Sequence, residues 1–141
     1  MIKINRGNYP KQRREPRAGV AQEILKNIDL ILNCSNHKKF VSFAEQFGRE
    51  MKNKNVKTSQ IRKIYTEVQK IRTFTDSEDQ MRLHMLRPKL AYAKGRHANL
   101  SDLQKVFDKL IVNIENAEHL KNFKQFFEAV LAYHKAFGGA D

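Results

Sequence analysis

Apolar residues recur every three or four positions along most of the chain, and this spacing limits the fold more than any other feature. From Val20 to Phe137 the recurrence changes phase at short polar breaks, as expected for successive amphipathic helices. No run of alternating β-branched residues and no hairpin dipeptide such as Asn-Gly competes with this pattern. The sequence therefore predicts an all-α fold, a single bundle of about five or six helices joined by short loops.

The phase changes and capping residues predict where each helix begins and ends. Ser, Thr and Asn side chains are favoured at the residue that precedes a helix, and Gly is favoured just after its end. The expected helices run from Val20 to near Cys34, from an N-cap at Ser35 through Met51, from a cap at Thr58 or Ser59 through Ile71, from the Ser77/Gln80 capping box to Gly95, from the Ser101/Gln104 capping box through Ile114, and from about Ala117 to Gly138.

The fourth predicted helix has two irregular features. Pro88 lies inside it and removes a backbone donor, so we expect the helix to kink or restart there. Gly95 is placed to end it in a left-handed turn. Met81 and Met85 follow the apolar period, so we interpret them as core residues before a surface for partners.

Positive charge dominates the composition and is densest at the start of the chain. The net charge is +12, from 27 Lys and Arg against 15 Asp and Glu, which indicates a polyanionic partner, either nucleic acid or an anionic membrane face. We interpret residues 1–19 as a basic arm that is disordered without ligand, and residues 20–141 as the helical bundle domain. The arm is either a solvated tail or a segment that lies along phosphates, and these two interpretations are compatible.

The residues that usually carry catalysis do not form a pattern. Cys34 is the single cysteine, the five histidines are scattered without ligand spacing, and neither glycine-containing segment has the spacing of a nucleotide-binding loop. We therefore expect a non-enzyme without metal or cofactor. No signal peptide or membrane span is predicted, so the expected location is the cytoplasm.

Two basic clusters stand out within the helical region. The segment LRPKLAYAKGR, residues 86–96, carries four cations and no acidic residue, and Lys52, Lys54 and Lys57 form a basic corner between two predicted helices. The first cluster is either the ordinary basic end of a helix or a surface that binds a polyanion. Tyr65 and Tyr92 could stack on bases, but both occupy apolar-periodic positions and are more consistent with the core.

Three segments of the chain resemble a known family. TSQIRKIYTEV (58–68), LRPKLAYAKGR (86–96) and FEAVLAYHKAFGG (127–139) are similar, in order and spacing, to the small helical subunit of type III-A CRISPR interference complexes, the Csm small-subunit family. The resemblance covers roughly the last two-thirds of the chain. The first two elements are fairly specific as a pair.

The resemblance implies a non-catalytic, all-helical subunit that binds the backbone of guide RNA and target RNA without reading sequence. The implied partners are these RNAs, the backbone subunits, the large subunit and adjacent copies of the same chain, including a homodimer in isolation. With the basic corner added, the predicted RNA-binding residues are Lys52, Lys54, Lys57, Gln60, Arg62, Lys63, Arg87, Lys89, Lys94, Arg96, His134 and Lys135.

Two other functional classes remain open from the sequence. One is a helical protein-interaction module whose charge only keeps it soluble and whose apolar last helix is the functional surface. The other is a small DNA-binding regulator, which is less favoured because no short helix–turn–helix pair with a readable recognition helix stands out.

Overall fold

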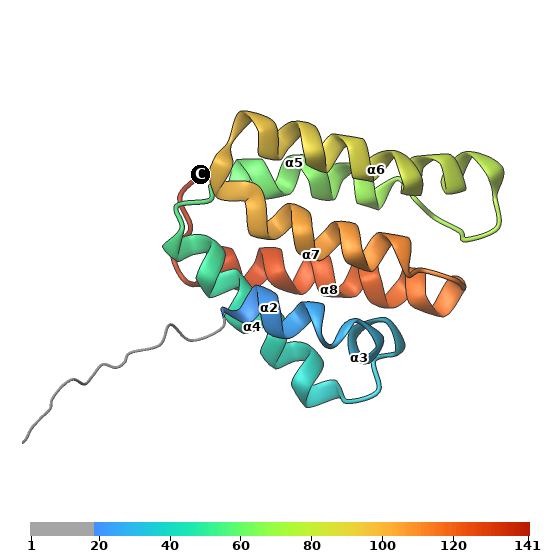
Figure 1. The fold of residues 1–141 in the computed structure, drawn as a ribbon, viewed down its shortest axis with the longest axis horizontal. Helices are drawn as coiled ribbons and strands as arrows, with labels where there is room; N and C mark the ends of the chain where they lie inside the picture. Colours follow the sequence, from blue (N-terminus) through green and yellow to red (C-terminus); the bar gives the residue numbers. More distant parts are fainter. Residues whose placement is uncertain (1–18) are drawn as a thin grey trace, which may run out of the picture.

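The computed structural model describes residues 19–141, which form a bundle of seven α-helices and one short 3₁₀ helix (Figure 1). The predicted all-α class is confirmed, and residues 19–141 contain no strand. The predicted basic arm lies outside the described residues except for Gly19. The elements are α2 (Val20–Leu25), α3 (Ile28–Asn33), α4 (His37–Asn53), α5 (Thr58–Gln69), α6 (Ser77–Arg96), η1 (Ala98–Leu100), α7 (Ser101–Val112) and α8 (Ala117–Ala136).

The first predicted helix is two helices in the structure. α2 ends at Leu25 and α3 begins at Ile28, with Asn27 between them at φ −127° and ψ 32°, outside helical geometry. The Asn27 side-chain amide donates to the Glu23 carbonyl at 2.7 Å and so satisfies one of the free carbonyls at the end of α2. The apolar residues keep the same helical spacing on both sides of Asn27, so the sequence pattern did not indicate a break there.

The helix caps are formed by Asn and Asp residues one position away from several of the predicted ones. The side chains of Asn36, Asp76 and Asn116 accept from the third backbone N–H of α4, α6 and α8, at 3.0, 3.1 and 2.8 Å. The predicted caps at Ser35 and Ser77 are therefore wrong. Ser59 and Ser101 do not cap either, because each lies inside its helix.

Phenylalanine side chains form the centre of the bundle. Phe107 of α7 stacks on Phe127 of α8 with ring centroids 4.2 Å apart, and it also contacts Phe123 and Phe126 of the same helix. Phe47 of α4 closes the cluster at 6.1 Å from Phe107. All five rings are fully buried, so α8 is a central helix of the bundle.

α4 and α8 cross at close range because a glycine lies at the contact. A Cβ on Gly48 would stand 2.8 Å from the His134 backbone nitrogen and 2.9 Å from the Val130 carbonyl oxygen. Backbone atoms cannot move aside as a flexible side chain could, so any other residue would push the helices apart. This contact holds the end of α8 against α4, close to the start of α5.

α6 is the helix that departs most from expectation. It runs without interruption through Pro88, whose exposed position lets the carbonyl freed at His84 face water. Gly95 lies inside the helix, and among residues 19–141 the glycine with a left-handed φ is Gly138, at 90°. The predicted restart at Pro88 and the predicted left-handed end at Gly95 are both wrong.

Three apolar residues of α6 face solvent instead of the core. Met81, Met85 and Tyr92 are 64%, 44% and 67% exposed, which corrects their interpretation as core residues. The buried side of α6 carries Leu83, Leu86 and Leu90, and this is the side that packs toward α5 and α7. α6 has apolar residues on two sides, so its sequence period does not reveal which side is buried.

Candidate nucleic-acid interface

A groove of about 550 Å³ lies between α5 and α6, near the start of α5 and the end of α6. The two helices are joined by the loop 70–76 and run side by side, so the first turns of α5 lie beside the last turns of α6 (Figure 1). The groove has an apolar floor and polar or charged walls. Its lining residues are Gln60, Lys63, Ile64, Glu67, Leu86, Pro88, Lys89, Tyr92, Ala93, Arg96, His97 and Leu100.

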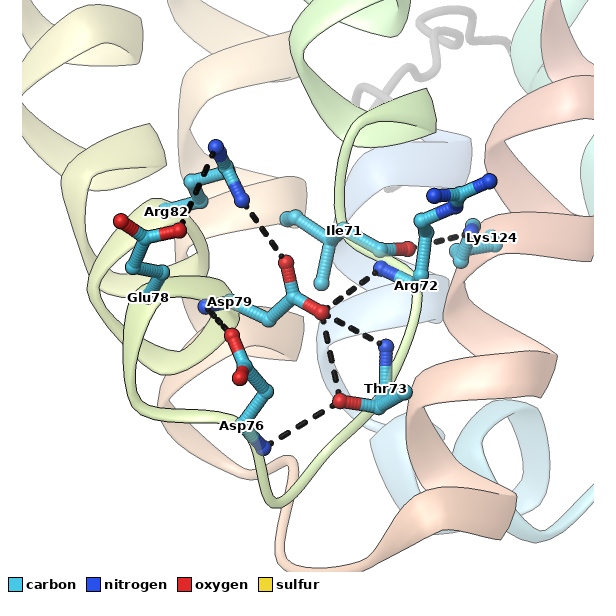
Figure 2. Close-up of polar contacts among 8 residues, drawn as sticks. All are labelled: Ile71, Arg72, Thr73, Asp76, Glu78, Asp79, Arg82 and Lys124. Atoms are coloured by element: carbon cyan, nitrogen blue, oxygen red, sulfur yellow. Dashed lines mark hydrogen bonds and ion pairs between the residues drawn. The ribbon is translucent and has the colours of Figure 1, made fainter.

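The far end of the α5–α6 hairpin is fixed by the buried carboxylate of Asp79 (Figure 2). It accepts from the backbone N–H groups of Arg72 and Thr73 at 3.2 and 3.0 Å, and from the Thr73 hydroxyl at 3.2 Å. Arg82, one turn further along α6, donates to its other oxygen at 3.0 Å. These bonds set the loop geometry, and therefore the position of α6 against α5.

Burial tends to raise the pKa of Asp79, but the hydrogen bonds from Thr73, Arg72 and Arg82 outweigh it and lower the pKa below its ordinary value. The carboxylate is therefore ionised at neutral pH. Lys124 of α8 donates to the Ile71 carbonyl on the other side of the same loop and ties it to the bundle (Figure 2).

One ion pair crosses the groove. Lys89 of α6 donates to Glu67 of α5 at 2.7 Å, and Lys70 binds the other oxygen of Glu67 at 3.0 Å. Hydrogen bonds from Lys89, and then from Lys70, lower the pKa of Glu67. The Lys89 ammonium has three donors, so this pair leaves it able to bind a second anion.

Lys63 and Arg96 are the unpaired cations of the groove. Lys63 is exposed on α5 and Arg96 is exposed on the last turn of α6, and neither has a carboxylate within 4 Å among residues 19–141. Gln60, half-buried beside them, uses its side-chain oxygen to accept from the Lys57 backbone N–H at 2.9 Å. That bond caps α5, so Gln60 has a structural role here and only its amide NH₂ remains for a ligand.

Three other predicted cations of α5 and α6 lie outside the groove. Arg87 points to α7, where it binds Asp108 at 2.7 and 3.4 Å, and hydrogen bonding to Asp108 raises its pKa. Arg62 and Lys94 are exposed, but neither lines the groove. The predicted RNA-binding cations of α5 and α6 are therefore divided, with Lys63, Lys89 and Arg96 together in the groove and Arg62, Arg87 and Lys94 elsewhere.

The basic corner lies at the same end of the bundle as the groove. Lys54 binds Asp102 and lies 3.7 Å from Glu50, and hydrogen bonding to Asp102 raises its pKa. The Asn99 amide, just after α6, donates to the Asn55 carbonyl at 3.0 Å, which brings this loop against the end of α6. Lys52 and Lys57 are exposed, and no ion pair joins either to another described residue.

The third predicted element divides between the surface and the interior. Lys135 is exposed and binds Asp141 at 2.8 Å. His134 is fully buried, with Nε2 2.6 Å from the Val56 carbonyl and Nδ1 3.3 Å from the Thr58 hydroxyl. Nε2 donates to Val56, which leaves Nδ1 as an acceptor in a neutral ring.

His134 therefore joins the end of α8 to the start of α5 and is not on an RNA-accessible surface. Burial lowers its pKa, the Val56 hydrogen bond opposes that shift, and the charge on Lys135 adds to it. Thr58, which the sequence suggested as a helix cap, is also fully buried here. Its backbone N–H donates to the Ala140 carbonyl at 2.6 Å, so the C-terminal segment packs on the start of α5.

Tyr92 and His97 are groove residues that were not predicted as site residues. Tyr92 was placed in the core, and His97 carried no signal beyond its position after a basic run. Among the described residues, no three His, Cys, Asp or Glu side chains form a set that could hold a metal ion. None of the helices described combines the length and the apolar character needed to cross a bilayer.

The architecture is that of a small all-helical protein with a cationic groove at one end of a hairpin. A family model described as Csm2 Type III-A matches residues 34–140, and the chain belongs to this family. It is therefore the small subunit of a type III-A CRISPR Csm complex, as the sequence resemblance indicated. No curated protein and no solved structure matched the chain in the corresponding comparisons.

Proposed function

We propose that this chain is a non-catalytic RNA-binding subunit that contacts the sugar–phosphate backbone through the α5–α6 groove. Its RNA partners would be the guide and target strands of the cytoplasmic Csm complex. Its protein partners would be the backbone subunits, the large subunit and adjacent copies of itself. Family membership supports assembly into the complex, and the groove supports the RNA contact.

The observation that carries this proposal is the convergence of Lys63, Lys89 and Arg96 on one groove from two helices. Cations separated by up to 33 residues in sequence share a surface, and two of them have no carboxylate partner among residues 19–141. Lys63 and Arg96 are exposed and unpaired, so they release counterions when they bind a phosphate, whereas Lys89 can bind one only in part while Glu67 holds it.

The remaining predicted residues have different relations to this groove. Lys52, Lys57 and Lys94 are exposed near the same end of the bundle and would extend the contact along the strand. Lys54, Arg87 and Lys135 each form an ion pair with an aspartate, and each would have to leave that carboxylate to bind a phosphate. Arg62 would serve a second strand or a neighbouring subunit, and His134 is left out because it is buried.

Phosphate contacts do not distinguish sequences, so base pairing between guide and target would supply specificity. The groove contributes positive charge and shape, without a nucleophile held by a general base. This arrangement suits a subunit that holds RNA while other subunits act on it.

The proposal can be tested by fluorescence anisotropy with a labelled single-stranded RNA of unrelated sequence, titrated at several salt concentrations. For the wild-type chain, log affinity should fall with log salt by about 0.7 per phosphate contacted. The double variant Lys63→Gln/Arg96→Gln removes two contacts. Its slope should be shallower by about 1.4, and its affinity near 0.15 M salt should fall about tenfold.

The matched control is Lys38→Gln/Lys39→Gln, which removes the same charge from exposed positions at the start of α4, away from the groove. It should leave the slope and the affinity close to wild type. Equal losses in both double variants would mean that net charge, not the groove, drives binding. No binding by the wild type even at low salt would favour the protein-interaction module.

A further inference from the structure

Tyr92 is an exposed aromatic residue that the fold does not use. Its side chain is 67% exposed, and no other aromatic ring among residues 19–141 packs against it. The other two described tyrosines are part of the bundle, since Tyr65 packs on Phe127 at 5.6 Å and Tyr133 stacks on Phe137 at 6.2 Å. With about two-thirds of its surface in water, the ring contributes little to the packing of the core and is accessible to a ligand.

The surroundings of Tyr92 match two different parts of a nucleotide. Tyr92 stands on the α6 wall of the groove, while Ile64, Leu86 and Leu100 contribute buried apolar atoms to its floor. A phosphate gains nothing from an apolar floor, but the face of a nucleobase does. Lys63 and Arg96, on the walls, are suited to the phosphates on either side of that base.

We propose that the α5–α6 groove takes one unpaired nucleobase of the bound RNA, stacked on the Tyr92 ring. Lys63 and Arg96 hold the flanking phosphates, and the Gln60 amide and His97 ring stand within the same groove beside the base. Every base has a stacking face, so this contact adds affinity without sequence preference. The inference rests on the proposed RNA-binding function and adds that the groove binds a nucleobase as well as the phosphates.

The groove volume agrees with this ligand. A volume of about 550 Å³ lies within the range of clefts that hold small molecules, and it exceeds what a single nucleobase occupies. Tyr92 is on a helix and not on a mobile loop, so little conformational entropy is lost when a base stacks on it. A base within a continuous duplex is already stacked, so the groove favours an unpaired one.

A protein partner is the competing use of Tyr92. Met81, Met85, Pro88 and Tyr92 are spaced by four, three and four residues, so they lie within an arc of about 60° on the outer side of α6. Met81 and Met85 do not line the groove, and they approach the acidic start of α6 at Asp76 and Glu78. The groove position of Tyr92, between cations, favours RNA for this residue.

The test compares Tyr92→Ala and Tyr92→Phe in the full chain on two RNAs. One is an ordinary single-stranded RNA, and the other has the same backbone with abasic positions throughout. Tyr92→Ala should bind the ordinary RNA about tenfold more weakly, with an unchanged salt slope because no phosphate contact is lost. Tyr92→Phe should keep nearly full affinity, and neither variant should differ from wild type on the abasic RNA.

Three results would overturn the inference. In the first, Tyr92→Ala binds ordinary RNA as tightly as the wild type does. In the second, Tyr92→Ala loses as much affinity for the abasic RNA as for the ordinary RNA. In the third, Met81→Ser/Met85→Ser loses as much affinity for ordinary RNA as Tyr92→Ala does. The last result would assign the ring to the outer stripe of α6 and not to the groove.

The failure of stacking and the failure of RNA binding are distinguishable. If Lys63→Gln/Arg96→Gln still weakens binding while Tyr92→Ala does not, the backbone contact stands and the base contact does not. Circular dichroism should show unchanged helix content and thermal stability for Tyr92→Ala, because the side chain is exposed and Ala favours a helix.

Discussion

The two ends of α6 carry similar numbers of charged residues but use them in opposite ways. At its start, Asp79 is buried and its carboxylate accepts from two backbone N–H groups, a hydroxyl and a guanidinium. At its end, Arg96 is exposed and has no carboxylate within 4 Å in the described part of the chain. The charged carboxylate at the start of α6 has all its partners within the protein, whereas the Arg96 guanidinium at the end has no charged partner in the described part of the chain.

This difference separates structural charge from charge available for binding. A polar group whose partners lie within the protein contributes to stability and has little to offer an external anion. A cation that has only water as a partner costs the protein little to keep and gains when a phosphate arrives. The predictions below test this distinction, beginning with the residue whose loss should cost most.

Replacing Asp79 by Ala should lower the thermal stability of the bundle more than any other single charge removal at this end of α6. The loop amides of Arg72 and Thr73 would lose their acceptor while they remain partly buried. A fall in Tm of several degrees is expected in thermal unfolding followed by circular dichroism. The wild-type contribution is present at neutral pH and should be lost as the pH falls through the lowered pKa of Asp79.

The matched control is Glu78→Ala, one position earlier on the same turn. The Glu78 side chain is 84% exposed and touches Arg82 only at 4.0 Å, so its loss should leave Tm within about a degree. Equal shifts in the two variants would indicate that Asp79 acts through the general charge of the helix start and not through its hydrogen bonds.

His134 gives the next effect, and it appears as a pH dependence. Its pKa is lowered in the folded protein, so the unfolded chain binds a proton more readily than the folded one. Stability should therefore be full above the ordinary His value of 6.5 and should decline as the pH falls below it. Measuring Tm between pH 5 and 8 would check this.

In His134→Gln, this part of the pH dependence should disappear, although stability would be lower at every pH because the Val56 carbonyl loses a partner. An NMR titration gives an independent check, since the His134 ring should remain neutral as the pH falls through the ordinary His value of 6.5. If the His134 ring became protonated at or above its ordinary value of 6.5, its buried position would be wrong.

Local patterns in the sequence predicted most of the helices, but they could not predict which side chains pair. The Lys89–Glu67 and Arg87–Asp108 ion pairs join residues 22 and 21 positions apart, on different helices. No helical spacing encodes such pairs, because they depend on how α5, α6 and α7 pack. The sequence therefore showed a basic segment without showing which of its cations are free.

The three α6 side chains that were wrongly assigned to the core share one cause. Met81, Met85 and Tyr92 fit an apolar period as well as Leu83, Leu86 and Leu90 do, and only the neighbouring helices decide which set is buried. His134 shows the converse, because a polar residue followed by Lys135 suggests a surface while its ring fills a gap beside Val56 and Thr58. In both cases tertiary packing overrides a local preference.

The smallest predicted effect comes from freeing a cation that the structure pairs. Glu67→Gln should release Lys89 and remove a negative charge from the groove. One additional phosphate contact would raise single-stranded RNA affinity about fourfold near 0.15 M salt and steepen the salt slope by about 0.7. The cost in stability should be below about 1 kcal/mol, because the pair is substantially exposed and screened by solvent.

Asp108→Asn is the matched control for this gain, since it makes the same change in net charge and frees Arg87 on the side of α6 that faces α7. If only charges in the groove bind RNA, its affinity should stay near wild type while that of Glu67→Gln rises. Equal gains in RNA affinity would mean that binding depends on the summed charge of the whole basic surface. The division of α6 into paired and free cations would then have no consequence for binding. A loss of affinity in Glu67→Gln would instead show that the ion pair holds Lys89 in the position from which it reaches the RNA.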